Sequence, residues 1–586
     1  MSNYTFSRNP IINITRSKFK RNHRLLTTFN AGKIVPIQID EVLPGDTKKL
    51  KTNCVIRMST PIKPVMDNAF CDIMHFFIPA RLLWEHWKEF QGENSSGYWK
   101  QQTEYTIPQT TAPTGGWNNG TLADYFGIPT KVSGLSVNSL PFRAYVQVWN
   151  DWFRDENNQN PAYMTTGDGT TTGTNGTNLV TDVITGGTLL PCAKIHDYFT
   201  SALPEPQKGP DVLMPFNVND AIPVTGMAPV ITHSVNVYGD DTNFQKPSTQ
   251  LRWSKTSDGT IVPTDNGTAN RLYIGKNALG VVNTSYSNDN FASETIQNNF
   301  TTRSVVPGNL WASAGIVDGT PELKAQLSAT MAPTINQLRL AFQLQKMYEK
   351  DARGGTRYIE IIKNHFGVTS SDARLQRSEY LGGSRVPITM QQVNQTSSTD
   401  ETSPQGNTAA FSLTADSQYS FTKSFEEHGY ILSVAMVRTT HTYQQGLNKL
   451  WNRKTRTDFY MPVFANIGEQ PIYNKEIYAQ GTAADDEVFG YQEAWADYRY
   501  FPNQVTGQFR SNHAENGGLD IWHYADYYTS KPTLGTDFIQ ETPNNIDRTL
   551  AVQSSVSHQF LADFYFESTE TRPLPIYSIP GLIDHH

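Results

Sequence analysis

Hydrophobic and polar side chains alternate towards both ends of the chain, and this alternation predicts β-strands. Residues 48–58 read KKLKTNCVIRM, with core-type side chains at even positions and mostly polar ones at odd positions. Residues 555–568 place three phenylalanines on one face and acidic side chains on the other. A period of two residues is that of a strand with one face against a core. We therefore expect strands mainly from about 40–80 and 410–570.

Two further segments are apolar at nearly every position. They read FCDIMHFFIP (70–79) and GYILSVAMVRTTHTY (429–443). Strands buried on both faces give such continuous apolar runs. Because these strands come from distant parts of the chain, we expect a mainly β protein, a β-sandwich with expanded loops.

Three segments show the 3.6-residue period of helices. The clearest covers about 140–157, where Ser139 can cap the helix and a stripe of aromatic side chains marks one face. A second helix is expected at about 334–353, opening with a capping box at Thr334, and a third at about 357–366. Between the first two lies a Gly-, Thr- and Asn-rich stretch, which predicts a large insertion between strands.

Composition narrows the class of protein. Only 18% of the 586 residues are charged, below the roughly 25% of ordinary globular proteins, while 11% are aromatic. A chain with few charged and many aromatic residues is typical of β-rich proteins with long ordered loops and interfaces that contain few charges. The three cysteines form no CxxC pair, and no apolar run has the length of a signal peptide or membrane span. We expect a soluble protein made in a reducing compartment.

Charge is distributed unevenly along the chain. The formal net charge is -7, yet the first 39 residues hold seven basic side chains and no acid. Lys and Arg neutralise phosphate and release counterions, so residues 1–39 are predicted to form a basic N-terminal arm that binds nucleic acid. A solvated tail is the equally open alternative. Five of the basic residues lie in RSKFKRNHR (16–24): Arg16, Lys18, Lys20, Arg21 and Arg24.

A second basic cluster, NKLWNRKTR, surrounds Trp451 with no acid before Asp458. It is a candidate to contact nucleic acid or a neighbouring subunit, and a solvated turn is as plausible. Trp149 and Trp152 on the first helix, like Trp451, are expected in the core or in a subunit interface. The basic side chains of this cluster are Lys449, Arg453, Lys454 and Arg456.

Motifs of enzymatic chemistry are missing from the sequence. There is no GxxxxGK[ST] loop, no HExxH and no GxSxG elbow. Glu426 and His428 can share one face of a strand, and GDDTN (239–243) could bind a cation, but an interfacial histidine and a plain acidic turn are the commoner outcomes. The sequence therefore identifies no catalytic residue, no cofactor and no metal-ligand set, and it predicts a non-enzymatic protein.

Long Trp-rich blocks resemble the major capsid protein of the Microviridae, small single-stranded-DNA bacteriophages, and most closely the gokushovirus branch. The resemblance covers most of the chain, but 217–330 matches nothing that we can place. The similar blocks begin with STPIKPVMDNAFCDIMHFFIPARLLWEHWKEFQGEN (59–94), FRAYVQVWNDWFRDENNQ (142–159), DYFTSALPEPQKGP (197–210) and SDARLQRSEYLGG (371–383). They continue with RTTHTYQQGLNKLWNRKTRTDFYMPVFANIGEQPI (438–472) and FGYQEAWADYRYFPNQVTGQFRS (489–511).

The resemblance implies an eight-stranded viral jelly roll over 40–586, with large inter-strand insertions that contain a few α-helices. It implies self-assembly of about sixty copies through pentamer intermediates into a T=1 icosahedral shell around circular single-stranded DNA. The variable surface insertion, about 217–330, would serve host attachment, and the arm would face the interior. Implied partners are a small basic DNA-packaging protein, a minor pilot protein and a host-cell receptor. The protein would be a virion component, synthesised in the cytoplasm of the bacterial host.

A second hypothesis comes from another functional class. Aromatic-rich loops on a β-sandwich are also found in carbohydrate-binding proteins and glycosidases, whose catalytic carboxylates have no spacing signature. That hypothesis predicts a monomer or small oligomer with affinity for sugars, whereas the capsid hypothesis predicts closed symmetric assembly.

Overall fold

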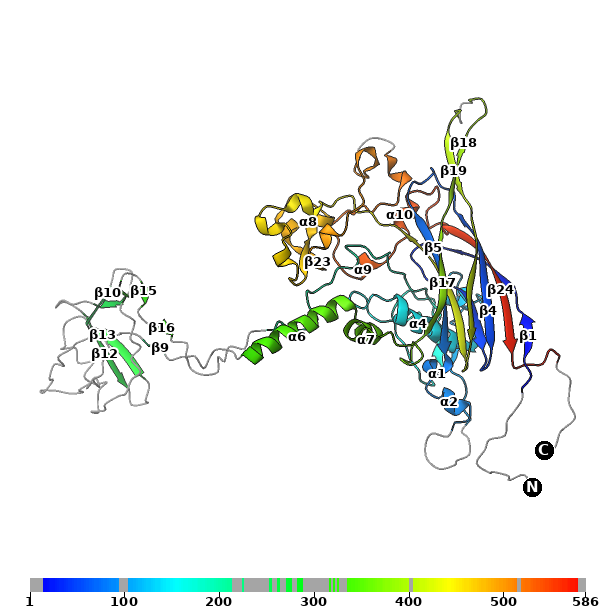
Figure 1. Ribbon diagram of the computed structural model, residues 1–586, viewed down its shortest axis with the longest axis horizontal. Coiled ribbons are helices and arrows are strands. Elements are labelled where there is room, and N and C mark those ends of the chain that lie inside the picture. Colours follow the sequence, from blue (N-terminus) through cyan, green and yellow to red (C-terminus); the bar gives the residue numbers. More distant parts are fainter. Residues whose placement is uncertain are drawn as a thin grey trace, which may run out of the picture. The chain divides into compact units, whose positions relative to one another are not determined.

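A computed structural model describes residues 14–93, 104–212, 335–399, 404–513 and 518–577, with the backbone of short strands between 224 and 325. The chain forms two compact units. One comprises Met1–Asp211 and Gln343–His586, and the other Val212–Phe342. The first unit contains a β-sandwich, seen at the right of Figure 1.

One sheet of the sandwich, called the first sheet, is built on β24 (Phe560–Arg572). On one side β24 pairs with β1 (Ser17–Lys20) and then β2 (His23–Phe29), which follow each other along the same edge. On its other side β24 pairs with β4 (Thr47–Met58), and β4 pairs with β20 (Thr414–Ser424). All of these pairings are antiparallel.

The other sheet, called the second sheet, has the order β17–β5–β21–β3. Counting β1 and β2 as one interrupted strand, the two sheets hold four strands each, in the chain orders 1-8-3-6 and 5-4-7-2. This interleaving of two antiparallel sheets is the eight-stranded jelly roll. The fold class expected from the sequence is thereby confirmed. The strands of the second sheet are β17 (Glu379–Pro387), β5 (Ala69–Pro79), β21 (Gly429–Thr439) and β3 (Val35–Val42).

The first sheet shows the alternation that its sequence predicts. Every second residue of β4 and β24 is buried, and the residues between them are exposed or half-buried. Register pairs Phe564 with Cys54 and Phe560 with Met58 on the inner face. These side chains belong to one continuous core with those of the second sheet. The outer face of the first sheet, which points away from the second sheet, carries mostly polar and charged side chains, together with exposed Leu26, Val55 and Leu561.

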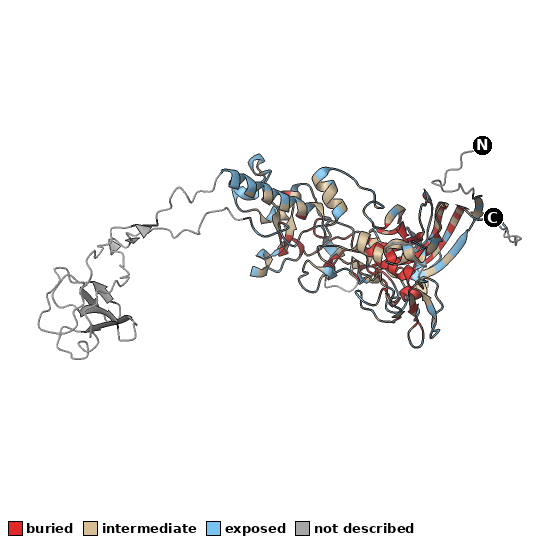
Figure 2. Cartoon of the chain, turned by 90° about the horizontal axis from the view of Figure 1, so that it is seen from below, coloured by how far each residue is buried: buried red, intermediate tan, exposed pale blue. Residues whose placement is uncertain are grey.

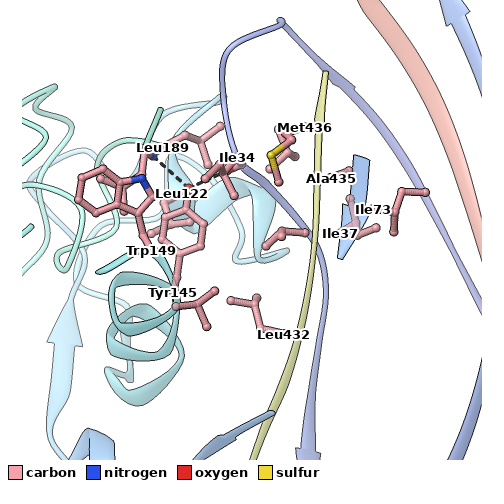
Figure 3. Packing of buried hydrophobic residues seen from close by; sticks show 14 of the residues in the cluster. Ile34, Ile37, Ile73, Leu122, Tyr145, Trp149, Leu189, Leu432, Ala435 and Met436 are labelled. Carbon is pink, nitrogen blue, oxygen red and sulfur yellow. Dashed lines mark hydrogen bonds between the residues drawn. The ribbon is translucent and has the colours of Figure 1, made fainter. Parts of the chain in front are cut away.

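The second sheet is buried on both faces along its two central strands, β5 and β21. Ten of the eleven residues of β21 are buried, which explains its continuous apolar sequence. Its outer face is covered by α4 (Leu140–Val148) and by the π-helical turn η1 (Trp149–Phe153) that continues it. Figure 3 shows Tyr145 and Trp149 on the side of β21 to which Leu432 and Met436 point, with Ile34 between Trp149 and Met436. Most of the buried residues of Figure 2 belong to this sandwich and its helical cover, and a second, smaller cluster lies among the loops.

The three predicted helices have different ends in the structure. α4 with η1 ends at Phe153, four residues before the expected end, because Arg154 is extended. α6 (Ile335–Gly354) and α7 (Tyr358–Phe366) lie close to the expected ranges, and α7 stops at Gly367, whose φ of 69° suits glycine. The capping residue expected for α6, Thr334, lies outside the described residues.

Strands also form outside the ranges that were expected to supply most of them. Within the predicted basic arm, residues 1–39, lie β1, β2 and the start of β3. The reason is that apolar side chains alternate with the basic ones and reach the core, as Phe29 does. β17 also lies outside the expected strand ranges, because it is irregular: its pairing with β5 shifts register between Tyr380 and Gly382.

Shorter elements fill the loops of the first unit. The helices are α1 (Ala80–Leu83), α2 (Trp87–Phe90), α3 (Leu122–Tyr125), α8 (Asn474–Ile477), α9 (Thr536–Ile539) and α10 (Asn544–Asp547). The 3₁₀ turns are η3 (Lys449–Asn452), η4 (Arg456–Asp458), η5 (Pro462–Phe464), η6 (Ala483–Asp486), η7 (Ala496–Tyr498), η8 (Gly507–Phe509) and η9 (Leu519–Trp522). The strands are β6 (Gln109–Thr111), β7 (Ser136–Asn138), β8 (Thr171–Thr172), the hairpin β18 (Met390–Asn394) and β19 (Thr408–Ser412), and the pair β22 (Gln470–Tyr473) and β23 (Val488–Gln492).

The second unit contains strands only as far as the structure describes it, apart from the start of α6. Four of them form a sheet of order β11–β10–β12–β13, and the others form two pairs. This unit spans the insertion expected at about 217–330. Its strands are β9 (Val224–Thr225), β10 (Arg252–Lys255), β11 (Ile261–Pro263), β12 (Asn270–Lys276), β13 (Val282–Ser287), β14 (Ile316–Val317), β15 (Thr320–Pro321) and β16 (Lys324–Ala325).

Candidate nucleic-acid interface

The basic run 16–24 lies along the edge of the first sheet. Lys18 pairs with Thr571 and Lys20 with Thr569, while Phe19 between them pairs with Glu570, a residue of the inner face. Strand alternation therefore turns Lys18 and Lys20 outward, and both side chains are exposed. Neither has an ion-pair partner among the residues that the structure describes.

Arg21 has a different environment at the break between β1 and β2. Its guanidinium lies 3.0 Å from Asp40 and 2.7 Å from Glu570. Glu570 also lies 3.2 Å from the Lys48 ammonium and 3.0 Å from Arg572. Burial alone would raise the pKa of Glu570, but the surrounding cations lower it to about 2. Arg21 is therefore part of an ion-pair network that joins β3, β4 and β24, and its charge is compensated.

The two remaining arginines of the run are both exposed. Arg24 on β2 makes a two-pronged ion pair with Asp563 on β24, with nitrogen–oxygen distances of 2.7 and 2.6 Å. Arg16 precedes β1, and its guanidinium packs over Gly45, where a Cβ atom would lie 3.1 Å from it. The structure thus divides the five basic residues into one compensated by two carboxylates at the sheet edge (Arg21), one paired with a surface carboxylate (Arg24) and three without an acidic partner in the described chain.

The second basic cluster lies on two 3₁₀ turns, η3 and η4. Arg453 donates to Asp497 and lies 4.2 Å from the centre of the Tyr498 ring, so its charge is compensated. Lys449 donates to the carbonyl oxygen of Pro471 over 3.4 Å. Lys454 and Arg456 are exposed, and neither has an acidic partner within the described residues.

The three tryptophans have different surroundings. Trp149 is 4% exposed and donates to the carbonyl oxygen of Pro191, so it belongs to the core. Trp152 is half-buried, donates to Ser378, and lies 4.2 Å below the guanidinium of Arg377. Trp451 is 71% exposed and is not part of the core of this chain.

A cavity of about 260 Å³ lies beside the second basic cluster. Lys449 and Trp451 contribute to its wall, together with His441. His441 lies 2.7 Å from Asp526 and 2.9 Å from Glu541. Burial would lower the pKa of this histidine, but the two carboxylates raise it to about 10. The histidine is therefore a fixed cation between acids, and it has no free nitrogen to act as a base.

Of the side chains considered for metal binding, Glu426 is exposed, and the ring of His428 lies edge-on to Trp87. The neighbouring Glu427 pairs with Arg81 at 2.7 Å. GDDTN (239–243) lies outside the described residues. Within the described ranges, no group of three or more His, Cys, Asp or Glu side chains is arranged to hold a metal ion. No helix in those ranges is long and apolar enough to cross a membrane.

Three further cations lie on the outer face of the first sheet and were not singled out from the sequence. Lys49, Lys51 and Arg57 alternate along β4 and point away from the core. Their signal was present in the alternation of KKLKTNCVIRM, but the sequence does not show that β4 lies two strands away from Lys18 and Lys20. Sheet pairing through β24 brings the two groups onto one surface.

Comparison with known proteins gives matches over nearly the whole chain. Residues 7–582 match the family described as Capsid protein (F protein). Capsid protein VP1 of Bdellovibrio phage phiMH2K is 42% identical, over 99% of this chain and 97% of the relative. Capsid protein VP1 of Spiroplasma virus 4 is also 42% identical, over 97% and 96%. Capsid protein VP1 of Chlamydia phage 1 is 40% identical, over 98% and 97%.

These matches agree with the fold. The chain has the two four-stranded antiparallel sheets of a jelly roll. The resemblance noted from the sequence blocks is thereby confirmed. The chain belongs to the capsid protein (F protein) family, and it is a structural component of a phage virion.

Proposed function

We propose that this chain is the major capsid protein of a small phage, and that about sixty copies form a T=1 icosahedral shell around circular single-stranded DNA. It would be synthesised in the cytoplasm of the bacterial host and would assemble through pentamers. A small basic packaging protein and a minor pilot protein would join the shell. The second unit, which spans the insertion, would carry host attachment and contact the receptor.

The observation that carries the assembly proposal is a set of large apolar side chains left in solvent on the loops around the second basic cluster. Trp451 is 71% exposed, Val463 79% and Phe501 77%. The loops that carry them contact one another, since Arg453 donates to the Tyr498 hydroxyl and Trp495 to the carbonyl oxygen of Phe464. Exposed apolar patches on soluble proteins usually mark a protein contact. A second copy of the chain is the partner that the capsid family implies.

The DNA contact is proposed for those basic residues whose charge is uncompensated. From the first run these are Arg16, Lys18 and Lys20. From the second cluster they are Lys454 and Arg456. Arg24 is proposed to contact DNA with them because it is exposed, although its charge is paired with Asp563. Arg21, Lys449 and Arg453 would stabilise the fold and would not contact DNA. Arg21 and Arg453 are paired with carboxylates, and Lys449 donates to a carbonyl oxygen.

The experiment expresses the full chain alone and with its packaging partners. Sedimentation and negative-stain microscopy then measure particle size, and nuclease protection measures enclosed DNA. Closed shells or pentamers are expected, and a monomer under every condition would overturn the proposal and favour the sugar-binding alternative.

A pair of variants tests the apolar contact. The double variant Trp451→Ser and Val463→Ser should fold, as circular dichroism reports, yet shift sedimentation towards smaller species. Val556→Ser, which alters an equally exposed valine on another loop, is the matched control. Equal loss of assembly in both variants would contradict the assignment of this contact.

A further inference from the structure

The outer face of the first sheet carries cations in register across several strands. One row runs Lys20, Thr569, Lys49 and Thr422 across β1, β24, β4 and β20. The row before it begins with Lys18 and Thr571. Neighbouring strands lie about 4.8 Å apart, so Lys20 and Lys49 start from backbone positions about 10 Å from each other.

The next rows continue the pattern and add aromatic rings. Glu567, Lys51 and Tyr419 form one row, on β24, β4 and β20. Arg24 and Tyr565 lead the row after it. Tyr419 is 58% exposed and Tyr565 41% exposed. Strand alternation thus places two tyrosine rings among the cations, on a face that no described helix covers (Figure 1).

The charge balance of this face is strongly positive. Its two carboxylates are already neutralised, since Asp563 is held by Arg24 and Glu567 lies 3.4 Å from Lys51. Six cations against two carboxylates leave four uncompensated positive charges, in a chain whose total is -7. The four cations with no acidic partner in the described part of the chain are Lys18, Lys20, Lys49 and Arg57.

We propose that this outer face is a binding surface for single-stranded DNA, with the cation rows on its phosphates and Tyr419 and Tyr565 stacked on unpaired bases. The inference rests on the proposed function, and it adds which surface of the sandwich the genome contacts. Basic side chains that follow a backbone, interleaved with exposed rings, are the combination that binds single strands without sequence preference.

Other occupants fit the face less well. A basic packaging protein would meet four uncompensated cations and be repelled. A duplex keeps its bases stacked inside, so the two tyrosines would have no partner. A second copy of the chain could supply carboxylates, and the exposed apolar side chains Leu26, Val55 and Leu561 lie in the two rows beyond Tyr565. In the rows of Lys18, Lys20, Lys49 and Lys51, hydroxyl and aromatic groups lie between the cations, and these match a phosphate–base chain better than a packed protein core.

The test measures binding of the full-length chain to a labelled oligothymidylate of about 20 nucleotides at several salt concentrations. The variant replaces Lys18, Lys20 and Lys49 by Gln. Each lost phosphate contact lowers the slope of log affinity against log salt by about 0.7, so we expect a slope shallower by about 2. A second variant, Tyr565→Ser, should weaken binding about tenfold with an unchanged salt slope.

The matched control replaces Lys346, Lys350 and Lys363 by Gln, which removes the same charge from exposed positions of α6 and α7. The control should keep the parental slope. A parental slope in the sheet variant, an equal loss in the control, or equal affinity for a duplex of the same length would each overturn the proposal.

Particle formation by the same variants separates this inference from the proposed function. Shells of normal size with less protected DNA in the sheet variant support both. Normal shells with normal DNA content and an unchanged oligonucleotide slope overturn only the binding surface. A chain that binds the oligonucleotide through this face but never forms shells overturns only the capsid proposal.

Discussion

The two sheets of the jelly roll differ in what lies on their outer faces. The second sheet is covered by α4 and η1, and β21 is accordingly buried along nearly its whole length. The first sheet has no helical cover among the described residues, and its strands β4 and β24 alternate strictly between buried and exposed positions. The same fold therefore contains one sheet that works as a core layer and one that works as a surface.

This difference shows on which sheet the protein can carry unpaired charges without losing stability. A charge placed on the second sheet must be paired, as Asp72 is between Arg385 and Arg438. Burial alone would raise the pKa of Asp72, but the two arginines lower it. On the outer face of the first sheet four cations need no partner, because water solvates them. A free sheet face can therefore accept a charged ligand.

The largest expected effect comes from the covered face of the second sheet. The Phe76 ring packs 5.7 Å from Trp152 and 5.6 Å from Phe153. Phe76→Ala should lower the free energy of unfolding by about 3–5 kcal/mol, because it leaves a cavity between the helix and the sheet. Denaturant titration followed by tryptophan fluorescence measures this loss. Tyr565→Ala on the open face is the control and should cost less than about 1 kcal/mol; equal losses would contradict the comparison.

The next effect concerns the ion-pair network on the inner side of the first sheet. Glu570→Gln should cost about 3 kcal/mol, because Lys48 and Arg21 lose one of the two carboxylates that compensate them and keep only Asp40. The folded pKa of Glu570, about 2, is below its unfolded value. Its contribution is therefore present above pH 4.5 and lost as pH falls towards 2. The variant should lose less stability over that range in acid titration, and a parental pH dependence would count against the network.

A smaller effect is expected between the two sheets, at His75. Burial, with a minor effect of Lys48, lowers the pKa of this histidine to about 3, and it hydrogen-bonds to Ser433. Between about pH 6.5 and pH 3, His75 is protonated in the unfolded chain but not in the folded chain. The free energy of unfolding therefore falls as pH drops from 6.5 towards 3. The loss by pH 5 should be on the order of 2 kcal/mol. His75→Gln should remove this part of the pH dependence of the thermal midpoint.

The smallest effect on stability is expected from the open face itself. Replacing Lys18, Lys20 and Lys49 by Gln should change the free energy of unfolding by less than about 0.5 kcal/mol, because these exposed side chains have no acidic partner in the described structure, and the contact of Lys49 with the Tyr419 ring, 5.9 Å from its centre, is solvent-exposed. Denaturant midpoints of the variant and the parent should coincide. A loss of several kcal/mol would show that these lysines stabilise the fold, and it would remove the distinction between the two sheets.

Much of the sandwich could be predicted from local patterns. The alternation in β4 and β24 and the apolar runs of β5 and β21 identified four of its strands. A strand buried on one face alternates apolar and polar residues, whereas a strand buried on both faces is apolar throughout. The edge strands β1, β2 and β17 were missed or misplaced. They carry basic residues or glycines, and only their pairing with β24 and β5 makes them strands.

The candidate site was determined by the sequence only in part. Composition and the charge run showed that positive charge is concentrated near the N-terminus of an acidic chain, and long blocks identified the capsid family. Which of those charges are available was decided by tertiary structure alone. Arg21 meets Asp40, 19 residues away, and Glu570, 549 residues away, whereas Lys18 and Lys20 meet solvent. The physical reason is that a charge depends on its neighbours in space, and sheet pairing brings those neighbours from opposite ends of the chain.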